Sequence, residues 1–392
     1  MKAFGDLNVD VLVLGGGPAG AAAARALADG GAVAAMAERS SYERFRTGET
    51  LPPVTNSLFA NLGLGHLLDG HLPSPGIVAS WGSEAPHEND FVFSRHGHGW
   101  HLDRRRFDES LAREAAEAGA TLLTNARAIS CERSSVGKWE VIIATEGTTL
   151  TVAAKWIIDA TGRSSWFTRS KGVDQLTYDR LVAVMAVLED DPARTDHRAF
   201  IEAMPDGWWY ASALPDGLAM AAYFTDSDLN DLRPGALADL WNDRLEASRL
   251  IASRLAGTRL SSGLRIVSCS TARAAFAAAD GWLAVGDAAR SIDPLSSQGI
   301  SWALSSGLDA AGVVLNNDPA SASALYESNW NEKFCNYLAT RRAFYLAEGR
   351  WPSSPFWLRR REEPRAYGRP RPVTPLLHNR SPLSRKDQSH AH

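Results

Sequence analysis

Apolar residues follow two different patterns along this chain, and each pattern predicts its own kind of structural unit. Short runs that are apolar at nearly every position predict strands buried on both faces, as in a parallel sheet covered by helices. The alanine-rich run Ala21–Ala28 and the segment that starts at Ile300 predict two of those helices. The buried strands are expected at Val9–Leu14, Ala32–Ala37, Trp156–Ile158 and Trp282–Val285.

The second pattern covers residues 176–226, where β-branched and aromatic residues gather in short runs between turn signals. Pro205-Asp206-Gly207 and Pro215-Asp216-Gly217 are typical turns, so the strands around them should be antiparallel. Alternation along a strand would place Trp208 and Tyr210 on one face and Trp209 on the other. The predicted strands are Leu181–Leu188, Ala199–Ala203, Trp208–Leu214 and Leu218–Thr225.

Composition narrows the class of protein without identifying it. The 392 residues are 45% hydrophobic and 22% charged, with a net charge of −4 and three cysteines. Such a chain is globular, and nothing in it favours nucleic acid, a membrane or a disulfide framework. We see no signal peptide and no apolar segment long enough to span a bilayer, and we therefore expect a cytoplasmic protein.

A glycine motif joins the first predicted strand to the first predicted helix. Gly15-x-Gly17-x-x-Gly20 has the spacing that lets a pyrophosphate approach a helix N-terminus, and Glu38 ends the next strand at the spacing of a ribose ligand. The motif predicts a dinucleotide cofactor. We expect contacts to it from Gly15, Gly17, Pro18, Ala19, Gly20, Glu38 and Arg39.

A second stretch, Gly286–Gly299, follows another buried strand and precedes a helix. It offers carboxylates and a row of backbone N–H groups to a polar ligand. This stretch resembles the second flavin-contacting motif of the FAD-dependent monooxygenases related to p-hydroxybenzoate hydroxylase, geranylgeranyl reductase and the tryptophan halogenases. Three further motifs are similar to that family: Asp159-Ala160-Thr161-Gly162, the Arg-x-x-Phe-Asp that begins at Arg104, and Arg46-Thr47-Gly48-Glu49.

The resemblance implies FAD as the cofactor and an α/β fold. A Rossmann-like FAD-binding domain at 1–60, 97–170 and 265–320 would enclose an antiparallel-sheet substrate domain at 61–96 and 171–264. Helices and a basic Pro/Arg-rich tail would follow at 321–392. The implied additional FAD contacts are Arg46, Gly48, Arg104, Asp159, Gly162, Gly286, Asp287, Pro294, Ser297, Gln298, Gly299 and Ile300.

Two departures from the halogenases bear on the reaction. Halogenases use a lysine in the N-terminal third and a glutamate in the second flavin motif. Here no lysine lies between Lys2 and Lys138, and Ser296 stands at the glutamate position. Asp293-Pro294-Leu295-Ser296-Ser297-Gln298-Gly299 and Gly207-Trp208-Trp209-Tyr210 are instead similar to flavoproteins that hydroxylate a protein tryptophan during tryptophylquinone maturation.

That resemblance implies an aromatic hydroxylase that works through a flavin C4a-hydroperoxide. Reducing equivalents would come from NAD(P)H or a separate flavin reductase, since a second dinucleotide motif is lacking. Glu49 and His98 are the candidate acid/base residues, Trp208, Tyr210 and Ser296 the candidate substrate contacts, and no metal site is expected. The alternatives are a reductase or dehydrogenase of the geranylgeranyl-reductase type and a non-catalytic flavin-binding maturation chaperone.

The C-terminal end is expected to serve the substrate. After a predicted helix at Ala320–Ala347, residues 350–392 carry ten basic and three acidic side chains, with Trp351, Phe356 and Trp357 among them. A solvated tail is the simpler interpretation of such a composition. The functional interpretation is that residues 350–372 help to dock a peptide or protein substrate.

Overall fold

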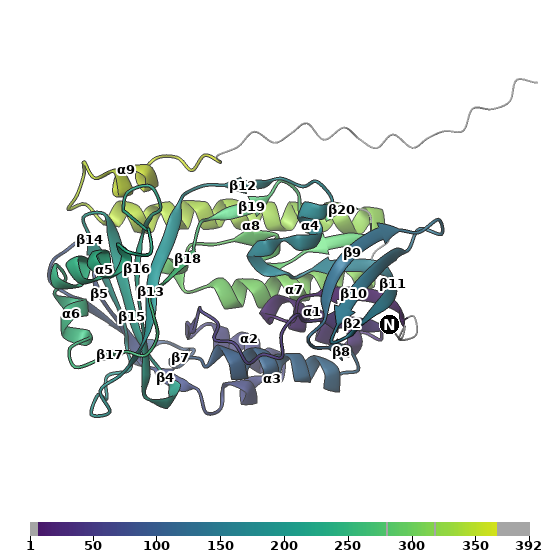
Figure 1. Ribbon diagram of the computed structural model, residues 1–392, viewed down its shortest axis with the longest axis horizontal. Helices are drawn as coiled ribbons and strands as arrows, with labels where there is room; N and C mark the ends of the chain where they lie inside the picture. The colour runs from purple at the N-terminus through teal and green to yellow at the C-terminus, as the bar shows by residue number, and fades with distance from the viewer. Residues whose placement is uncertain (1–6, 280, 317–318, 367–392) are drawn as a thin grey trace, which may run out of the picture.

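The structure, a computed structural model, describes residues 7–279, 281–316 and 319–366. Two large sheets lie toward opposite ends of the molecule, and long helices run between them (Figure 1). This arrangement confirms the predicted α/β fold, with a Rossmann-like unit and an antiparallel-sheet unit. The described helices are α1 Pro18–Asp29, α2 Thr55–Asn61, α3 Arg104–Glu117, α4 Trp166–Ser170, α5 Leu237–Glu246, α6 Leu250–Arg254, α7 Gly299–Asn316, α8 Pro319–Ala347 and α9 Pro355–Arg361.

The first sheet contains the four strands expected to be buried. Its order is β20-β21-β11-β1-β2-β8, with β10 on β11 and β9 on β10, and β1 pairs in parallel with both β2 and β11. Parallel neighbours need helical crossovers, and α1 supplies the first one. The strands are β1 Leu7–Leu14, β2 Ala34–Ala37, β8 Thr121–Leu123, β9 Arg127–Arg133, β10 Trp139–Thr145, β11 Thr148–Asp159, β20 Ala278–Ala279 and β21 Trp282–Ala284.

The second sheet is antiparallel apart from its β14–β5 contact and runs in the order β17-β13-β16-β15-β14-β5-β6, with β18 also on β13. It carries Trp208 in one core cluster and Trp209 in another, so the predicted alternation is confirmed. Its strands are β5 Gly76–Ser80, β6 His87–Asp90, β13 Leu181–Glu189, β14 Ala199–Met204, β15 Gly207–Leu214, β16 Leu218–Asp226, β17 Arg259–Leu260 and β18 Arg265–Ser268.

Two small three-stranded sheets connect these units. The first joins β3 Thr50–Leu51, β7 Gly99–His101 and β4 Leu72–Ser74, and the second joins β12 Gln175–Thr177, β19 Ala272–Ala274 and β22 Arg290–Ser291. Segments predicted for the FAD-binding domain supply the first large sheet, and segments 61–96 and 171–264 supply most of the second. The domain limits stay predictions, and β18, which begins at Arg265, pairs with β13 of the second sheet.

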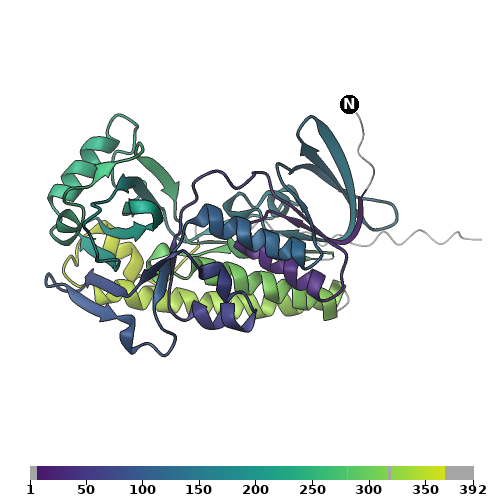
Figure 2. The same cartoon turned by 90° about the horizontal axis from the view of Figure 1, so that it is seen from below.

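Small residues bring α1 and α7 together over the first sheet. A Cβ added at Gly307 would overlap the carbonyl oxygen of Ala19, so only glycine allows this approach. Figure 2 shows α1 and α3 on the same side as the two long helices. The glycine motif on α1 and the Gly286–Gly299 stretch before α7 are therefore neighbours.

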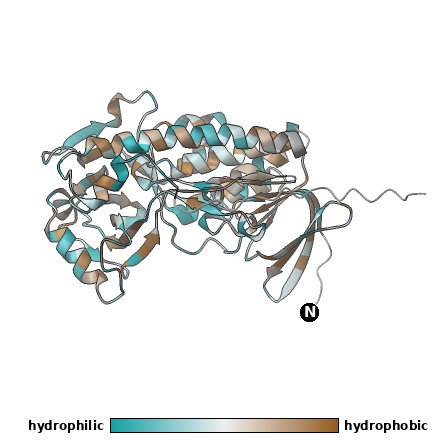
Figure 3. Cartoon of the chain, turned by 90° about the horizontal axis from the view of Figure 1, so that it is seen from above, coloured by the Kyte–Doolittle hydropathy of each residue, from teal (hydrophilic) through white to brown (hydrophobic). Residues whose placement is uncertain are grey.

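The long helix α8 ties the two units into one body. Tyr326 and Trp330 near its start belong to the core of the first unit, and Tyr345 near its end belongs to the core of the second. Figure 3 shows hydrophobic and hydrophilic residues interleaved along the long helices, as expected for a helix that packs on several partners. Among the described residues, no helix combines the length and the apolar character that crossing a bilayer demands.

Candidate functional site

The turn between β1 and α1 is built so that backbone approaches backbone closely. Gly15 has a φ of +107°, and a Cβ at Gly20 would overlap the carbonyl oxygen of Gly15. Gly17, which precedes α1, instead faces open space, with only an Arg46 guanidinium nitrogen 4.0 Å from its virtual Cβ. The first turn of α1, including Pro18 and Ala19, carries no acidic side chain. An anion can therefore reach the positive end of this helix.

Glu38 lies beside this turn at the end of β2. Its carboxylate accepts hydrogen bonds from the Gly16 amide at 2.8 Å and from the Arg46 guanidinium at 3.0 Å. Arg46 also donates to Asp108 at 2.9 Å, which fixes the loop after β2 against α3. Arg39 is exposed beyond Glu38. The sequence predicts Glu38 as a ribose ligand and Arg46 as a further cofactor contact, and the structure brings these two side chains together beside the β1–α1 turn.

Arg104, at the start of α3, also binds the loop that follows β2. Its guanidinium donates to the carbonyl oxygens of Thr47 and Gly48, at 2.7 and 2.8 Å, and pairs with Asp108 at 2.9 Å. Gly48 needs its φ of +85° to present that carbonyl. In this structure Arg104 therefore positions the loop that carries Gly48 and Glu49.

The end of β11 forms a third part of the site. Asp159 is fully buried, and its carboxylate accepts hydrogen bonds from backbone and hydroxyl groups of Thr161 and Thr168, so it shapes the turn from within. Gly162 follows with a φ of +64° and open space around its virtual Cβ. Arg163, the next residue, approaches Asp287 at 3.4 Å.

The two carboxylates of the Gly286–Gly299 stretch point in different directions, Asp287 toward solvent and Asp293 into the protein. Gly286 adopts a φ of +55° where a Cβ would lie 3.0 Å from that of Ala19. The Asp287 side chain is 39% exposed, yet the surrounding protein raises the pKa of this carboxyl by desolvation. Exposure combined with desolvation is what a carboxyl inside a concave site experiences. Asp287 is thus available to a ligand.

Asp293 instead points into the protein. Its carboxylate accepts hydrogen bonds from Arg341 at 3.0 Å and Tyr345 at 2.8 Å, both on α8. These contacts hold the next residues, Pro294–Ser296, in a short 3-10 turn.

The row of amides follows this turn. Ser297 adopts a φ of +51°, and Gln298 leads into Gly299 and Ile300, the first residues of α7. Nothing lies within 4 Å of a virtual Cβ at Gly299.

These parts fit FAD. Two helix N-termini without acidic side chains in their first turns, those of α1 and α7, open beside glycines with free space. Glu38 and Asp287 offer acceptors for hydroxyl groups, which is the chemistry of a ribose and a ribityl chain. Gly17, Glu38, Asp287 and Gly299 would hold the cofactor. Within the described residues, no group of three or more His, Cys, Asp or Glu side chains could hold a metal ion.

The second sheet turns one face toward this cofactor site. Trp208 and Tyr210 of β15 lie on that face, and Leu295 of the 3-10 turn packs against the same cluster. Trp208 is 1% exposed, stacks on Phe224 with ring centres 3.9 Å apart and donates to Tyr345 at 3.2 Å. It is a core residue in this structure. Tyr210 is left as the aromatic residue on β15 that reaches the polar groups described next.

A buried hydrogen-bonded cluster joins the loop around Glu49 to β15. Ser212 donates to the Glu49 carboxylate at 3.0 Å. Beside it, the Tyr210 hydroxyl bonds to the Thr50 hydroxyl, and Thr50 bonds to His101 Nδ1 at 3.1 Å. We call Glu49, Thr50, His101, Tyr210 and Ser212 the Glu49 cluster.

The protonation state of His101 determines which groups of the Glu49 cluster donate hydrogen bonds and which accept them. Complete burial lowers the pKa of His101 to about 4, so the imidazole is neutral near pH 7. His101 Nε2 lies 2.9 Å from the carbonyl oxygen of His197 and must donate to it. Nδ1 then accepts from Thr50, and Thr50 accepts from Tyr210. Burial and the charge of Glu49 raise the pKa of Tyr210 well above its usual value, so the tyrosine remains a donor.

His98, the histidine predicted for catalysis, makes no described hydrogen bond to a residue of the Glu49 cluster. Its Nδ1 faces the carbonyl oxygen of Gly99 at 2.9 Å, and its ring packs edge-on against Trp100. Ser296 donates to the Asp293 carbonyl at 3.4 Å. Sequence reasoning singled out neither Thr50 nor Ser212 and preferred His98 to His101. Ser212 could have been found, because it is two residues after Tyr210 and thus on the same face of β15.

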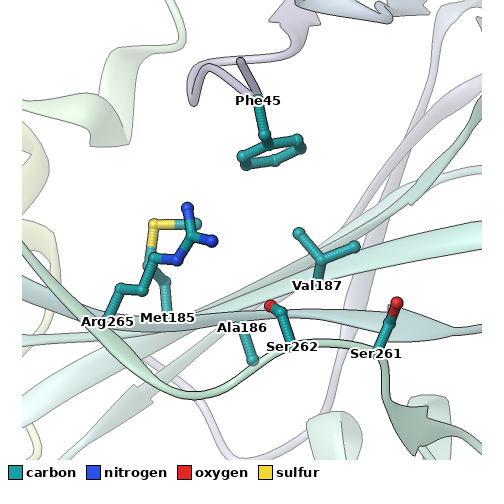
Figure 4. Close-up of a pocket in the computed structure, with 7 residues that line it drawn as sticks. All are labelled: Phe45, Met185, Ala186, Val187, Ser261, Ser262 and Arg265. Carbon is teal, nitrogen blue, oxygen red and sulfur yellow. The ribbon is translucent and has the colours of Figure 1, made fainter. Parts of the chain in front are cut away.

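A pocket of about 180 Å³ opens between Phe45 and the second sheet (Figure 4). Met185 and Val187 of β13 form its floor, and Ser261, Ser262 and Arg265 line it further. Through β16, Met185 lies in register with Tyr210, and Val187 lies in register with Ser212. Adjacent strands are about 4.8 Å apart, so the floor of the pocket lies roughly 10 Å from the Glu49 cluster on the same face.

We expect His101 to make the protein less stable in acid. A histidine whose pKa drops from 6.5 to about 4 on folding stabilises the protein fully only above about pH 6.5, and this contribution is lost as the pH falls toward 4. The loss amounts to about 3 kcal/mol of unfolding free energy. Urea unfolding of His101→Gln and the wild type between about pH 7 and pH 4.5 measures it. The difference in unfolding free energy between the wild type and His101→Gln should become smaller in acid. A difference that stays constant with pH would contradict the lowered pKa of His101.

Among the known proteins that this chain resembles are an oxidoreductase, a halogenase and a dihydroxylase. A family model described as an FAD binding domain matches residues 8–311. The FAD-dependent oxidoreductase LodB of Marinomonas mediterranea is 30% identical over 359 residues, which cover 90% of this chain and 97% of LodB. The flavin-dependent halogenase CmlS has a TM-score of 0.82 and 27% identity, covering 90% of this chain and 67% of CmlS. The peptidyl tryptophan dihydroxylase QhpG, essential for tryptophylquinone cofactor biogenesis, has a TM-score of 0.76 and 26% identity, covering 90% of this chain and 79% of QhpG.

Proposed function

Because the chain belongs to the family with this FAD binding domain and is an FAD-dependent oxidoreductase, we propose that it hydroxylates an electron-rich aromatic ring, a tryptophan side chain in a peptide or protein. The observation that carries this proposal is the pair of halogenase residues that the chain lacks. Ser296 stands where halogenases place a glutamate, and no lysine occurs between Lys2 and Lys138. The similarity to QhpG supports the same reaction class.

When bound and reduced, FAD would supply the electrons and the oxygen activation that the side chains cannot supply. One oxygen atom of O2 is transferred to the ring carbon, and the other leaves as water with two electrons from the reduced cofactor. The ring carbon loses its hydrogen as a proton. The chain must therefore orient the ring, exclude water and receive that proton.

The Glu49 cluster is suited to these tasks. Glu49 is 5% exposed, and one of its side-chain oxygens accepts a hydrogen bond from Ser212, so the carboxylate is held in one orientation. We assign Glu49 as the proton acceptor. Tyr210 donates toward Thr50, which leaves the lone pairs of its hydroxyl oxygen to accept a hydrogen bond from an indole N–H. Tyr210 would then orient the ring.

The electron donor belongs to the same proposal. One G-x-G-x-x-G motif occurs in the chain and lies at the FAD site, which favours reduction from outside by NAD(P)H or by a separate flavin reductase. The enzyme would then turn over with either source of reduced FAD. Photoreduced enzyme mixed with oxygen tests the oxygen-transfer half alone, without any donor.

A coupled measurement tests the function. Enzyme with reduced FAD, oxygen and a tryptophan-bearing peptide should consume oxygen in proportion to a mass gain of about 16 units for each oxygen atom transferred. A reductase would instead reduce a substrate double bond without such a gain. A maturation chaperone would bind the peptide and leave its mass unchanged. Either result would end the hydroxylase proposal.

The C-terminal tail is a proposed docking element for the peptide substrate. Within 350–361 the structure shows a packed segment: Phe356 and Trp357 are fully buried, and Arg359 and Arg360 pair with Asp226 at 3.0 and 2.6 Å. Docking by the tail is therefore proposed for residues 365–372. Residues 367–372 of this range lie outside the described residues. A truncation after Ala347 would remove the core residue Trp357 and is not a useful test.

Truncation after Ala366 keeps the packed segment and Arg365 and removes the five basic residues that follow. We expect a labelled acidic tryptophan peptide to bind this variant about threefold to tenfold more weakly at low salt. Exposed charges attract a ligand at a distance, and salt weakens this attraction. Fluorescence anisotropy measures the affinity. Equal affinities for the full and the shortened chain would remove the tail from the docking proposal.

A further inference from the structure

One edge of the second sheet is open next to the pocket under Phe45. Strand β18 pairs only with β13 among the described strands, and Arg265, Ile266 and Ser268 are exposed. An open strand edge offers unpaired backbone N–H and C=O groups to an added strand. We call the stretch Arg265–Ser268 the β18 edge.

The register shows which backbone groups of the β18 edge face outward. The Cys269 amide donates to the Leu181 carbonyl at 2.9 Å, so this opposed pair belongs to the hydrogen-bonded kind. Such pairs alternate along an antiparallel ladder, and the next ones are Ala183 with Val267 and Met185 with Arg265. Ile266 and Ser268 therefore turn their N–H and C=O groups away from β13, toward solvent.

The β18 edge also carries positive charge without an internal counterion. The side chains of Arg265, and of Arg259 on the neighbouring β17, make no hydrogen bond or ion pair with any residue that the structure describes. Glu189 is the cross-strand neighbour of Arg259 and forms no ion pair with it. Exposed Leu260 and Ile266, at 53% and 42%, lie on the same edge but on the opposite face of the sheet, because they pair with Leu188 and Val184. The surface is therefore complementary to an acidic segment with apolar side chains.

The pocket beside the β18 edge suits an aromatic side chain. Figure 4 shows the Phe45 ring across the opening from Met185, with Arg265 beside the methionine. A ring face and a thioether are favourable neighbours for a planar aromatic group. Arg265 opposes Met185 in the ladder, so one residue links the open edge to the pocket.

We propose that the β18 edge binds an extended acidic segment of the peptide substrate as an added strand. An aromatic side chain of that segment enters the pocket under Phe45, and carboxylates two residues before and after it, on the same face of the added strand, pair with Arg265 and Arg259. The inference rests on the proposed function, because it names the partner of that site. It places the peptide at the same sheet face as the Glu49 cluster, two strands away.

Binding of two synthetic peptides tests the charge requirement. The probes are a short fluorescein-labelled peptide with a central tryptophan flanked by aspartates and its counterpart with lysines. The full-length, FAD-loaded protein should bind the acidic peptide at least about tenfold more tightly, and Arg265→Glu should abolish most of that preference. Arg127→Glu on β9 is the matched control, because Arg127 is also exposed and without a described partner. Equal binding of the two peptides, or unchanged binding by Arg265→Glu, would overturn the proposal.

Ile266→Pro tests strand addition separately. The proline removes an outward N–H and leaves the ladder bonds of Arg265 and Val267 to β13 in place. Loss of one backbone hydrogen bond should weaken the acidic peptide about threefold to tenfold, with melting temperature and FAD content reporting whether the variant is folded. A folded variant that binds like the wild type would rule out an added strand.

The two proposals fail in different ways. A peptide that gains oxygen equally with wild type and Arg265→Glu leaves the hydroxylase intact and removes the β18 edge as its docking site. A peptide that binds in the way expected here but never gains oxygen keeps the docking site and removes the hydroxylase.

Discussion

Gly20→Ala should leave a protein that can no longer hold FAD. A Cβ at this position would overlap the carbonyl oxygen of Gly15 in the β1–α1 turn and lie 3.0 Å from the Cβ of Ala160, which follows β11. The clash is with backbone, so the turn itself must move and the N-terminus of α1 moves with it. Overpacking of this kind costs about 3 kcal/mol, and displaced phosphate-binding amides should lower FAD affinity about a hundredfold.

The measurements are urea unfolding and the ratio of flavin to protein absorbance after gel filtration. Gly312→Ala in α7 is the matched control, because a Cβ there meets nothing within 4 Å. Alanine in a helix interior should stabilise that variant by about 0.5–1 kcal/mol and leave its flavin content unchanged. A Gly20→Ala protein with full flavin content would contradict the assignment of this turn to the cofactor.

Glu49→Gln should reduce hydroxylation about a hundredfold or more while the protein still binds FAD. The amide can still accept the hydrogen bond from Ser212, so the fold of the Glu49 cluster is preserved, but it cannot receive a proton. Proton transfer by a positioned side chain contributes about 10²–10⁴-fold to a rate. Tyr210→Phe should lower the yield of hydroxylated product per oxygen consumed, because the ring would lose its orienting acceptor.

Glu202→Gln provides the control for a buried glutamate. Glu202 on β14 is 7% exposed and accepts hydrogen bonds from the amides of Arg249 and Ile251, both at 2.9 Å, which makes it a structural residue. Its substitution should change the melting temperature and leave the turnover number unchanged. Steady-state oxygen consumption and mass spectrometry of the peptide separate the two glutamates. Equal turnover of Glu49→Gln and wild type would remove Glu49 from the mechanism.

The elements around the cofactor could be predicted from the sequence because their signals are local. Val9–Leu14, the glycine motif and Ala21–Ala28 specify a strand, a turn and a helix within one short stretch, and the structure has β1 and α1 there. The same holds for the strands around the Pro-Asp-Gly turns. In each case backbone geometry demands particular residues at a particular spacing.

The contacts of the site could not be predicted in the same way, because they join distant segments. The His101 imidazole meets Thr50 through the pairing of β3 with β7, and Tyr210 reaches Thr50 from the other unit. Asp293 looks like a ligand-binding carboxylate in the sequence, but two side chains of α8 occupy it. The sequence favours Trp208 as a substrate contact, but burial on both faces of β15 makes Trp208 and Trp209 core residues.

On the function proposed here, this enzyme transfers oxygen and not a halogen to an aromatic ring. The direct measurement uses a tryptophan-bearing acidic peptide, reduced FAD, dioxygen labelled with the heavy isotope of oxygen, and excess chloride and bromide. We expect a peptide heavier by about 18 mass units for each labelled oxygen atom, with the added mass on the tryptophan and no halogen isotope pattern. A halogenated tryptophan, or oxygen consumption without any labelled peptide, would contradict it.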